Sequence, residues 1–388
     1  MSSPSVFRSA ALSLAASLIL ALPAASAATA PDGQSATAAD AGTSAVQRKA
    51  VAKGLYELAY SPRQNAVFVA SSGGFGDAAG PAQVLRLDPD TLAVQAGIAL
   101  ERKAFGLVLD DAGDRLYVGN TVDTSVTVVD TARNAVVGTV QLMEKVVDKD
   151  GKASYSHDLR ELVVDAPNHR LYVTGHSGEG SVLFVVDTQS LELVDTIPGL
   201  GKAKAPGLTL DAASGRVFTS NLLGEVVVVG TDSHKVEQRF KVGAEQPMNL
   251  ALDPSGKRLF VTDQGLEMIR KYQASSIPGF ASRHPGKRVL VLDPATGREL
   301  ASIPTGAGPL GLLLDAPRKR LYVTNREAGT VTAYDSESYR QVASYAVPTH
   351  PNSLALDARR NVLYVTIKNG EGDAKDSDEG VARIALEG

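Results

Sequence analysis

The sequence has no cysteine and no tryptophan among its 388 residues, and only 5% of its residues are aromatic. Without thiols the chain forms no disulfide, no thiolate metal site, no cysteine nucleophile and no covalent haem attachment. A hydrophobic core must therefore stabilise the fold, and a chain of this length is ample for one. The missing tryptophan and vicinal cysteine pair also count against a quinone-cofactor dehydrogenase, so we expect no bound cofactor.

Long apolar runs are also scarce, and the one that stands out is near the start of the chain. Residues 10–22 are apolar, Arg8 precedes them, and the small residues Ala25-Ser26-Ala27 follow Pro23. This layout is typical of a cleavable signal peptide over residues 1–27 and is too short for a spanning helix. We therefore expect export to the periplasm, with cleavage after about Ala27. No later run predicts a membrane span.

Residues 28–47 contain almost only Ala, Thr, Ser, Gly, Asp and Gln, with Val46 as the one large apolar side chain. Such a segment buries too little surface to offset the entropy of ordering, so we interpret it as a disordered linker before a single domain over residues 48–388. The formal net charge of −4 becomes −5 when the one positive charge of Arg8 leaves. That balance is too mild to favour a strongly charged partner such as nucleic acid.

A short repeated pattern organises the rest of the sequence. Its clearest copy is RLYVTN, residues 320–325. The central aromatic ring recurs seven times, as Phe68, Tyr117, Tyr172, Phe218, Phe260, Tyr322 and Tyr364. An aspartate lies seven residues before six of these rings, at Asp110, Asp165, Asp211, Asp253, Asp315 and Asp357. Successive rings are 42 to 62 residues apart, which is the length of one propeller blade.

Each repeated unit predicts four short antiparallel strands. In the sixth unit, apolar or β-branched runs of about five residues alternate with turns rich in Asp, Gly, Pro, Ser and Asn. The first strands, such as LVLD and LLLD, are apolar on both faces, so each sheet needs a neighbour on either side. These features predict an all-β fold, a seven-bladed β-propeller of four-stranded antiparallel blades.

The ends of the domain complete this prediction. The seventh unit provides three strands, the last at residues 381–386, and residues 49–53 have no partner within the first unit. Pairing the two segments would let the N-terminal strand close the last blade and remove a sheet edge. The repeated aspartates are expected to cap hairpin turns, and Arg115, Arg170, Arg216, Arg258 and Arg320 to pair with them across the turn.

The whole chain after the linker resembles the YVTN β-propeller repeat family, and more narrowly the YncE-like periplasmic proteins of Gram-negative bacteria. The resemblance lies in residues 48–61 (RKAVAKGLYELAYS), RELVVD at 160–165, RLYVTN, VLYVTIK at 362–368 and THPNSLALD at 349–357. It implies a seven-bladed propeller in the periplasm and a connection with outer-membrane uptake of iron or other nutrients. It implies no defined activity.

The candidate site is the mouth of the central channel, where first strands begin and second strands end. Polar residues at these positions depart from the repeat and form a funnel suited to a small polar or anionic group. The predicted ligand-binding residues are Tyr56, Glu57, Arg160, Glu161, His176, Asn249, Arg326, His350 and Asn352. A metal held by His176, His350 and Glu161 is the weaker alternative, and our prediction is no metal site.

We therefore predict a binding protein whose channel mouth receives a protein partner or a small anionic ligand. An enzyme, resembling either a quinoprotein dehydrogenase or a lactonase, is the first alternative, although no catalytic motif or carboxylate pair stands out from the repeat. The second alternative concerns an extra stretch at residues 265–286 in the fifth unit, where basic and aromatic residues alternate. Contact with a partner or single-stranded nucleic acid is predicted there for Arg270, Lys271, Tyr272 and Arg283.

Overall fold

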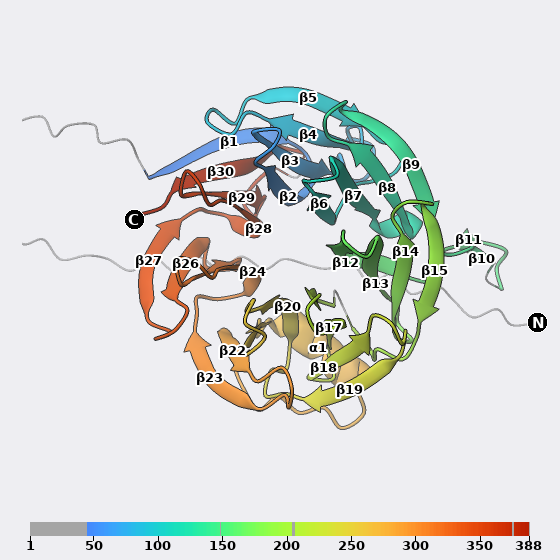
Figure 1. The fold of residues 1–388 in the computed structure, drawn as a ribbon, viewed down its shortest axis with the longest axis vertical. Coiled ribbons are helices and arrows are strands. Elements are labelled where there is room, and N and C mark those ends of the chain that lie inside the picture. The colour runs from blue at the N-terminus through green and yellow to red at the C-terminus, as the bar shows by residue number, and fades with distance from the viewer. Residues whose placement is uncertain (1–44, 148, 204–205, 375, 388) are drawn as a thin grey trace, which may run out of the picture. The chain divides into compact units, whose positions relative to one another are not determined.

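The seven copies of the repeated unit form seven four-stranded antiparallel sheets around a common axis, as the sequence predicts (Figure 1). The structure is a computed structural model that describes residues 45–387 except 148, 204, 205 and 375. The expected signal peptide and residues 28–44 of the expected linker lie outside the described residues. Within the described part, no helix combines the length and apolar character that crossing a bilayer requires.

Six blades are built from strands that follow one another in the chain. The first two contain β2 (Leu55–Ser61), β3 (Ala66–Ser71), β4 (Gln83–Leu87) and β5 (Val94–Ala99), then β6 (Leu107–Asp110), β7 (Arg115–Asn120), β8 (Ser125–Asp130) and β9 (Ala135–Gln141). The next two contain β12 (Asp158–Asp165), β13 (Arg170–His176), β14 (Ser181–Asp187) and β15 (Glu192–Ile197), then β16 (Leu208–Asp211), β17 (Arg216–Asn221), β18 (Glu225–Gly230) and β19 (Val236–Lys241). The fifth and sixth contain β20 (Pro247–Leu252), β21 (Leu259–Asp263), β22 (Arg288–Leu292) and β23 (Glu299–Pro304), then β24 (Pro309–Asp315), β25 (Arg320–Asn325), β26 (Thr330–Asp335) and β27 (Gln341–Ala346).

The seventh blade joins the two ends of the domain. It contains β28 (His350–Asp357), β29 (Val362–Lys368), β30 (Glu379–Ala385) and, as its outermost strand, β1 (Val46–Ala52). β1 runs antiparallel to β30, with Lys49 opposite Val381, which confirms the predicted closure (Figure 1). The strand begins at Val46, two residues before the expected domain boundary, because the register continues to a pairing of Val46 with Ile384.

Apolar side chains between neighbouring blades form the core. All seven central rings of the repeat are at most 3% exposed. Tyr172 of the third blade, for example, packs in one cluster with Leu208 and Val217 of the fourth. Each ring therefore shields the facing surface of the next sheet, which explains why the first strands are apolar on both faces.

The repeated aspartates have the structural role predicted for them. Asp253 accepts a hydrogen bond from the Ser255 amide at 3.1 Å, and Asp357 accepts one from the Arg359 amide at 3.0 Å. The aspartates after the third strands do the same, as when Asp335 accepts from the Ser338 amide at 2.7 Å. These carboxylates satisfy turn amides that would otherwise lack partners.

The predicted partners of the repeated arginines are wrong in four of five cases. Arg258 does bind Asp253, at 2.6 Å. The others bind acidic residues of the third or fourth strand: Arg115 with Asp130, Arg170 with Asp187, Arg320 with Asp335, and Arg216 with Glu237. The ladder places Arg115 directly opposite both Asp110 and Asp130. Both aspartates accept from turn amides, Asp110 from that of Gly113 and Asp130 from that of Arg133, so these amides do not decide which carboxylate Arg115 binds.

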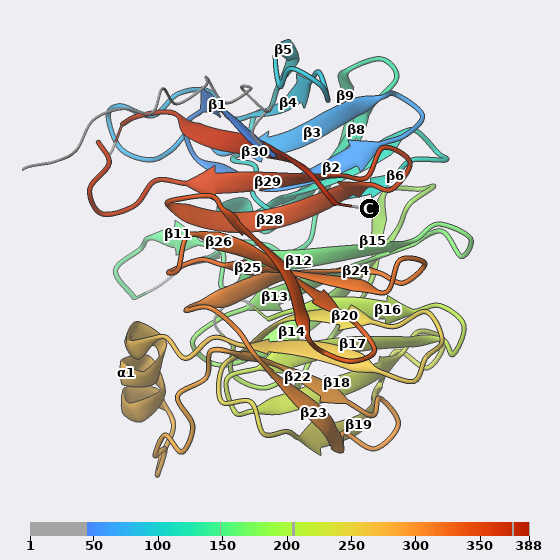
Figure 2. The same ribbon diagram turned by 90° about the vertical axis from the view of Figure 1, so that its left-hand side faces the viewer.

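Three further elements depart from the blade pattern. They are the 3₁₀ helix η1 (Thr121–Asp123), the hairpin β10 (Val146–Val147) with β11 (Ala153–Ser154), and the helix α1 (Glu267–Ser276). α1 lies in the extra stretch between β21 and β22, where the sequence suggested no helix. The hairpin and α1 both project from the same end of the propeller (Figure 2).

Removing β1 tests the closure of the propeller. A variant that begins at Lys53 should unfold at a lower denaturant concentration than one that begins at Ala45, because six paired positions with β30 are lost. At about 0.5–1 kcal/mol for each backbone pairing, the free energy of unfolding should fall by roughly 3–6 kcal/mol. Urea unfolding monitored by circular dichroism provides the measurement. Equal midpoints for the two variants would show that β1 does not close the ring.

Candidate functional site

The channel mouth opens into a cavity of about 1050 Å³ at the end of the propeller from which α1 projects. Seven of the nine predicted mouth residues line it: Tyr56, Glu57, Arg160, His176, Arg326, His350 and Asn352. The other two, Glu161 and Asn249, line a smaller cavity of about 180 Å³. Glu57, Arg160 and Asn352 belong to both linings, so the two cavities form an upper and a lower tier of one channel.

The walls of the upper tier are mixed in character. Tyr56 and Phe105 pack edge to face, with ring centroids 4.6 Å apart. Met248 and Leu310 add apolar surface from the fifth and sixth blades. A ligand in this tier would therefore contact apolar side chains as well as the polar groups.

Arg326 is the principal cationic group of the upper tier. It follows the last residue of β25, and its Nη1 donates to Oδ1 of Asn352 at 3.1 Å. Burial lowers the pKa of Arg326, the negative charges of Glu327 and Glu379 raise it, and the positive charge of Arg160 lowers it. Among the described residues, no carboxylate lies within ion-pair distance of the Arg326 guanidinium. Arg326 therefore forms no ion pair, although the acidic residues Asp158, Glu327, Glu371 and Asp373 line the same cavity.

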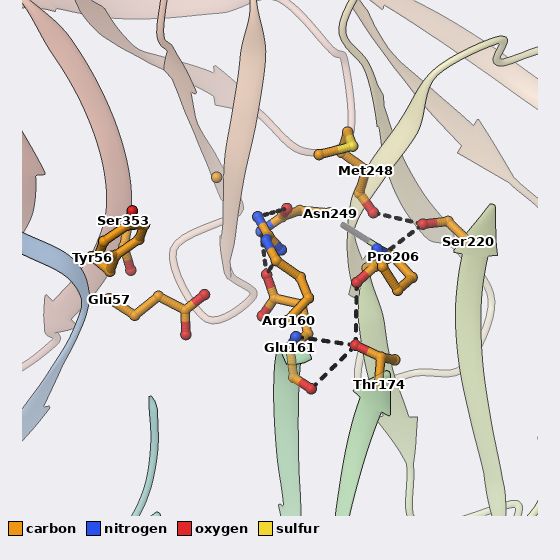
Figure 3. A network of polar contacts seen from close by, with 12 residues as sticks. Tyr56, Glu57, Arg160, Glu161, Thr174, Pro206, Ser220, Met248, Asn249 and Ser353 are labelled. Atoms are coloured by element: carbon orange, nitrogen blue, oxygen red, sulfur yellow. Dashed lines mark hydrogen bonds and ion pairs between the residues drawn. The ribbon is translucent and has the colours of Figure 1, made fainter. Parts of the chain in front are cut away.

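The lower tier contains a network of three side chains from two blades (Figure 3). Arg160 and Glu161, neighbours on β12, form an ion pair in which both side chains are at most 20% exposed. Asn249 of β20 accepts from Arg160 Nη2 at 3.2 Å and donates to Glu161 Oε1 at 3.2 Å. The amide thus holds both members of the ion pair in a fixed position.

Glu57 of β2 extends toward this network across the channel (Figure 3). Its Oε2 accepts from the Leu107 amide at 2.9 Å. Burial raises the pKa of Glu57 to about 8, and the negative charge of Glu161 also raises it, whereas Arg160 lowers it. The side chain therefore carries a proton at neutral pH. The structure thus brings together a carboxylate pair, Glu57 and Glu161, where the sequence indicated none.

Lys368, at the end of β29, is a second cation near the mouth, but it has structural partners. Its Nζ lies 3.9 Å from the centroid of the Tyr56 ring and donates to Glu379 at 2.9 Å and to the Leu55 carbonyl at 2.6 Å. Glu379 in turn accepts from the Leu55 amide at 2.6 Å. These contacts tie the last blade to the first, so Lys368 is neutralised where Arg326 is not.

The predicted histidines do not assemble a metal site. His176 and His350 line the upper tier, and His350 Nδ1 lies 3.1 Å from the Asn369 carbonyl oxygen. Glu161 belongs to the lower tier. Within the part of the chain that the structure describes, no three His, Asp or Glu side chains converge in a way that could hold a metal ion.

The extra stretch at residues 265–286 forms part of the rim. Leu266 and Met268 line the upper tier, and Met268 is 77% exposed. Gln273 of α1 fixes the helix by donating to the carbonyls of Leu222 and Glu245 at 3.0 and 2.7 Å. Gly265 and Gly286, both with positive φ, pack so closely at the neck that a side chain on either would collide with backbone.

The four residues of this stretch predicted for partner or nucleic-acid contact differ in exposure. Arg270 donates to the His284 carbonyl at 2.8 Å and so stabilises the stretch itself. Tyr272 is half-buried, whereas Lys271 and Arg283 are exposed. Only the last two present free charge to solvent, and contact with a partner or a nucleic acid stays a prediction.

Comparison with known protein sequences identifies relatives of this chain. Over 297 residues the chain is 35% identical to the uncharacterized protein YncE of Salmonella typhimurium, covering 75% of this chain and 76% of that protein. Over 220 residues it is 36% identical to the uncharacterized protein YncE of Escherichia coli O157:H7, covering 56% of this chain and 61% of that protein. The chain belongs to the YncE family.

Other comparisons concern the fold alone. No family model matches the sequence. The hydrazine synthase of Kuenenia stuttgartiensis superposes with a TM-score of 0.63 at 18% identity, covering 82% of this chain and 93% of that one. The Cps50 (Swd1) β-propeller domain of Myceliophteria thermophila gives a TM-score of 0.64 at 10% identity, covering 87% and 98%. These likenesses support the propeller architecture of this YncE-family protein.

Replacing Glu57 tests the protonated carboxyl in the channel. Its pKa is about 8 in the folded chain against an ordinary value of 4.5, so the folded state binds more protons between these pH values. The contribution of the Glu57 carboxyl to the free energy of unfolding is fully present below about pH 4.5 and is lost as the pH rises through 8. Relative to Glu57→Gln, the wild type should therefore lose roughly 2–4 kcal/mol of unfolding free energy between pH 5 and 8.

Urea unfolding at pH 5, 6, 7 and 8 would measure this difference. Glu101→Gln is the matched control, because Glu101 is exposed on the surface. Its profile should run parallel to that of the wild type. Parallel profiles for Glu57→Gln as well would show that Glu57 is ionised at neutral pH in the folded protein.

Proposed function

We propose that this YncE-family propeller is a binding protein that holds a small organic anion in the upper tier of its channel. The observation that supports this proposal most directly is Arg326, whose guanidinium lines the cavity and has Asn352 as its hydrogen-bond partner. A guanidinium has five N–H donors, so four remain for a ligand. Removing a charge from water is costly, and an anionic ligand would offset that cost.

The neighbouring residues support the same ligand class. Asn352 lies between Arg326 and the backbone of Tyr56, and it holds the guanidinium in one orientation. Carboxylates and phosphates suit a guanidinium held in this way because two of their oxygens can accept in parallel. The Arg160 guanidinium also lines this cavity, paired with Glu161, and the acidic residues Asp158, Glu327, Glu371 and Asp373 line it as well.

The size and walls of the cavity restrict the ligand further. A volume of about 1050 Å³ lies at the upper end of the range for small-molecule sites. Phe105, Met248 and Leu310 provide apolar contacts. We therefore infer an amphipathic ligand that places its anionic group on Arg326 and its apolar part against these side chains. A partner protein that inserts a carboxylate-bearing segment would satisfy the same contacts.

We also propose that the protein works in the periplasm and that its ligand connects it with uptake across the outer membrane. Residues 1–27 have the layout of a signal peptide, and the cysteine-free composition makes folding independent of disulfide formation. The connection with uptake rests on the resemblance to the YncE-like proteins, and no residue of the site identifies a nutrient.

Substituting Arg326 tests the proposed binding role. Isothermal titration with succinate, citrate and phosphate should show saturable binding of at least one of them to the wild type. Arg326→Gln should weaken that binding by about tenfold or more, since a hydrogen bond to a charged group contributes about 1.5–3 kcal/mol. Arg340→Gln, at an exposed position, is the matched control and should bind as the wild type does. Absence of saturable binding, or equal binding by Arg326→Gln, would contradict the proposal.

Expression of the full chain in a Gram-negative host tests the proposed compartment. Osmotic-shock fractionation should recover the protein in the periplasmic fraction, and intact-mass measurement should show a new N-terminus at about Ala28. Deleting residues 2–27 should leave the protein in the cytoplasmic fraction. Recovery of the uncleaved full chain from the cytoplasm would contradict export.

A further inference from the structure

Among the described residues, the channel contains a guanidinium, that of Arg326, and a carboxyl group, that of Glu57, neither of which forms an ion pair. The upper tier is also lined by the acidic residues Asp158, Glu327, Glu371 and Asp373. In the upper tier Arg326 is not matched by a carboxylate within ion-pair distance among the described residues. In the lower tier two carboxyl groups, Glu57 and Glu161, share one guanidinium, that of Arg160. A ligand in the upper tier also contacts Glu57, because that residue lines both tiers.

From this arrangement we propose that the ligand is a zwitterion, a molecule with a carboxylate that binds Arg326 and a primary ammonium that binds Glu57. Amino acids and short peptides belong to this chemical class. This proposal rests on the proposed anion site at Arg326 and adds to it a second contact, between the ammonium and Glu57. An ammonium between Glu57 and Glu161 would supply the positive charge that two carboxylates and one guanidinium lack.

The orientation of Glu57 favours an ammonium over a second anion. Its Oε2 is held by the Leu107 amide, which points the carboxyl into the channel toward Glu161 (Figure 3). Glu161 is fixed by Arg160 and Asn249 and cannot turn away. In the free protein a proton relieves the repulsion between the two carboxyl groups, and burial raises the pKa of Glu57 to about 8. An ammonium would displace that proton.

The groups that face Glu57 come from several blades. Charged groups are Arg160 and Glu161 on β12, with Arg326 beyond β25, and uncharged groups are the Leu107 amide of β6, Asn249 of β20, and Asn352 and Ser353 of β28. Two histidines, His176 and His350, also line the upper tier. Any pH dependence of binding must therefore be compared with that of variants lacking each histidine.

The test uses matched ligand pairs of increasing length. The protein is titrated separately with each member of a pair: an amino acid, and the carboxylate in which a methyl group replaces its ammonium. The amino acids are glycine, β-alanine, 4-aminobutyrate, 5-aminovalerate and 6-aminohexanoate, and hexanoate, for example, is the partner of 5-aminovalerate. At one length or more, the amino acid should bind the wild type at pH 7.5 at least tenfold more tightly than its partner. Glu57→Gln should reduce that ratio to about one, since glutamine can still accept from the Leu107 amide but carries no negative charge for the ammonium.

The pH dependence gives a second readout. If binding displaces the Glu57 proton, the affinity for the amino acid should rise by about tenfold per pH unit from pH 6 to 7.5, and protons should be released to the buffer. The affinity for the plain carboxylate should not rise. His176→Asn and His350→Asn should keep the slope, and Glu57→Gln should abolish it.

Four outcomes would overturn the zwitterion proposal. If the amino acid and the plain carboxylate bind equally well at every length, and Arg326→Gln still abolishes carboxylate binding, the ammonium contact is rejected and the anion site is retained. A high ratio that persists in Glu57→Gln would place the ammonium elsewhere. No binding of any compound would reject both this proposal and the anion site, whereas loss of the ratio in Glu101→Gln would show an effect of overall charge.

Discussion

The structure depends on the burial of apolar surface between sheets that cannot shield themselves. Every blade has two apolar faces, and each face is covered by the next blade around the ring. This mutual covering must continue around the full circle, because one missing contact would expose two faces to water. Tyr364 of the last blade packs with Leu55, Val67 and Val69 of the first, and β1 completes the last sheet. The closing contact is therefore as much a part of the core as any other.

This constraint also determines where polar function can lie. The side chains between blades are buried and apolar, and the repeated aspartates satisfy the turn amides. The beginnings of the first strands and the ends of the second strands can vary without disturbing the stacking. Glu57, Arg160 and Asn352 occupy such positions, and the rigid inner strands hold them in place. The site is thus built from residues that the blades themselves do not need.

Periodicity in the sequence was sufficient to predict the blades, their number, the closing strand and the face on which the mouth opens, because each follows from a local pattern repeated at regular spacing. Seven of nine predicted mouth residues line the upper tier for the same reason. Contacts across the ring could not be predicted in this way. Glu57 and Glu161 are 104 residues apart in the chain, and only the curvature of the ring brings them together.

Other features depended on competition between nearby partners. Arg115, for example, faces Asp110 on one side and Asp130 on the other and binds Asp130, a choice that the repeat alone does not determine. The helix α1 begins at Glu267, and its N-cap residue, Leu266, provides no side-chain hydrogen bond. Contacts with Leu222 and Glu245, rather than its own sequence, hold the helix in place. Such choices are made by tertiary contacts, which a repeat pattern does not contain.

The positions of Arg326 and Glu57 in one channel have a consequence for selectivity. A plain anion would gain the contact with Arg326 and leave Glu57 protonated, and a plain cation would gain the contact with Glu57 and leave Arg326 without an anionic partner. Only a molecule that carries both charges at a matching separation gains both contacts, so the distance between Arg326 and Glu57 selects the length of the ligand. Glu57 belongs to the innermost strand β2, whereas Arg326 lies in the turn directly after β25, where Asn352 of β28 holds its guanidinium, so contacts between blades set that distance.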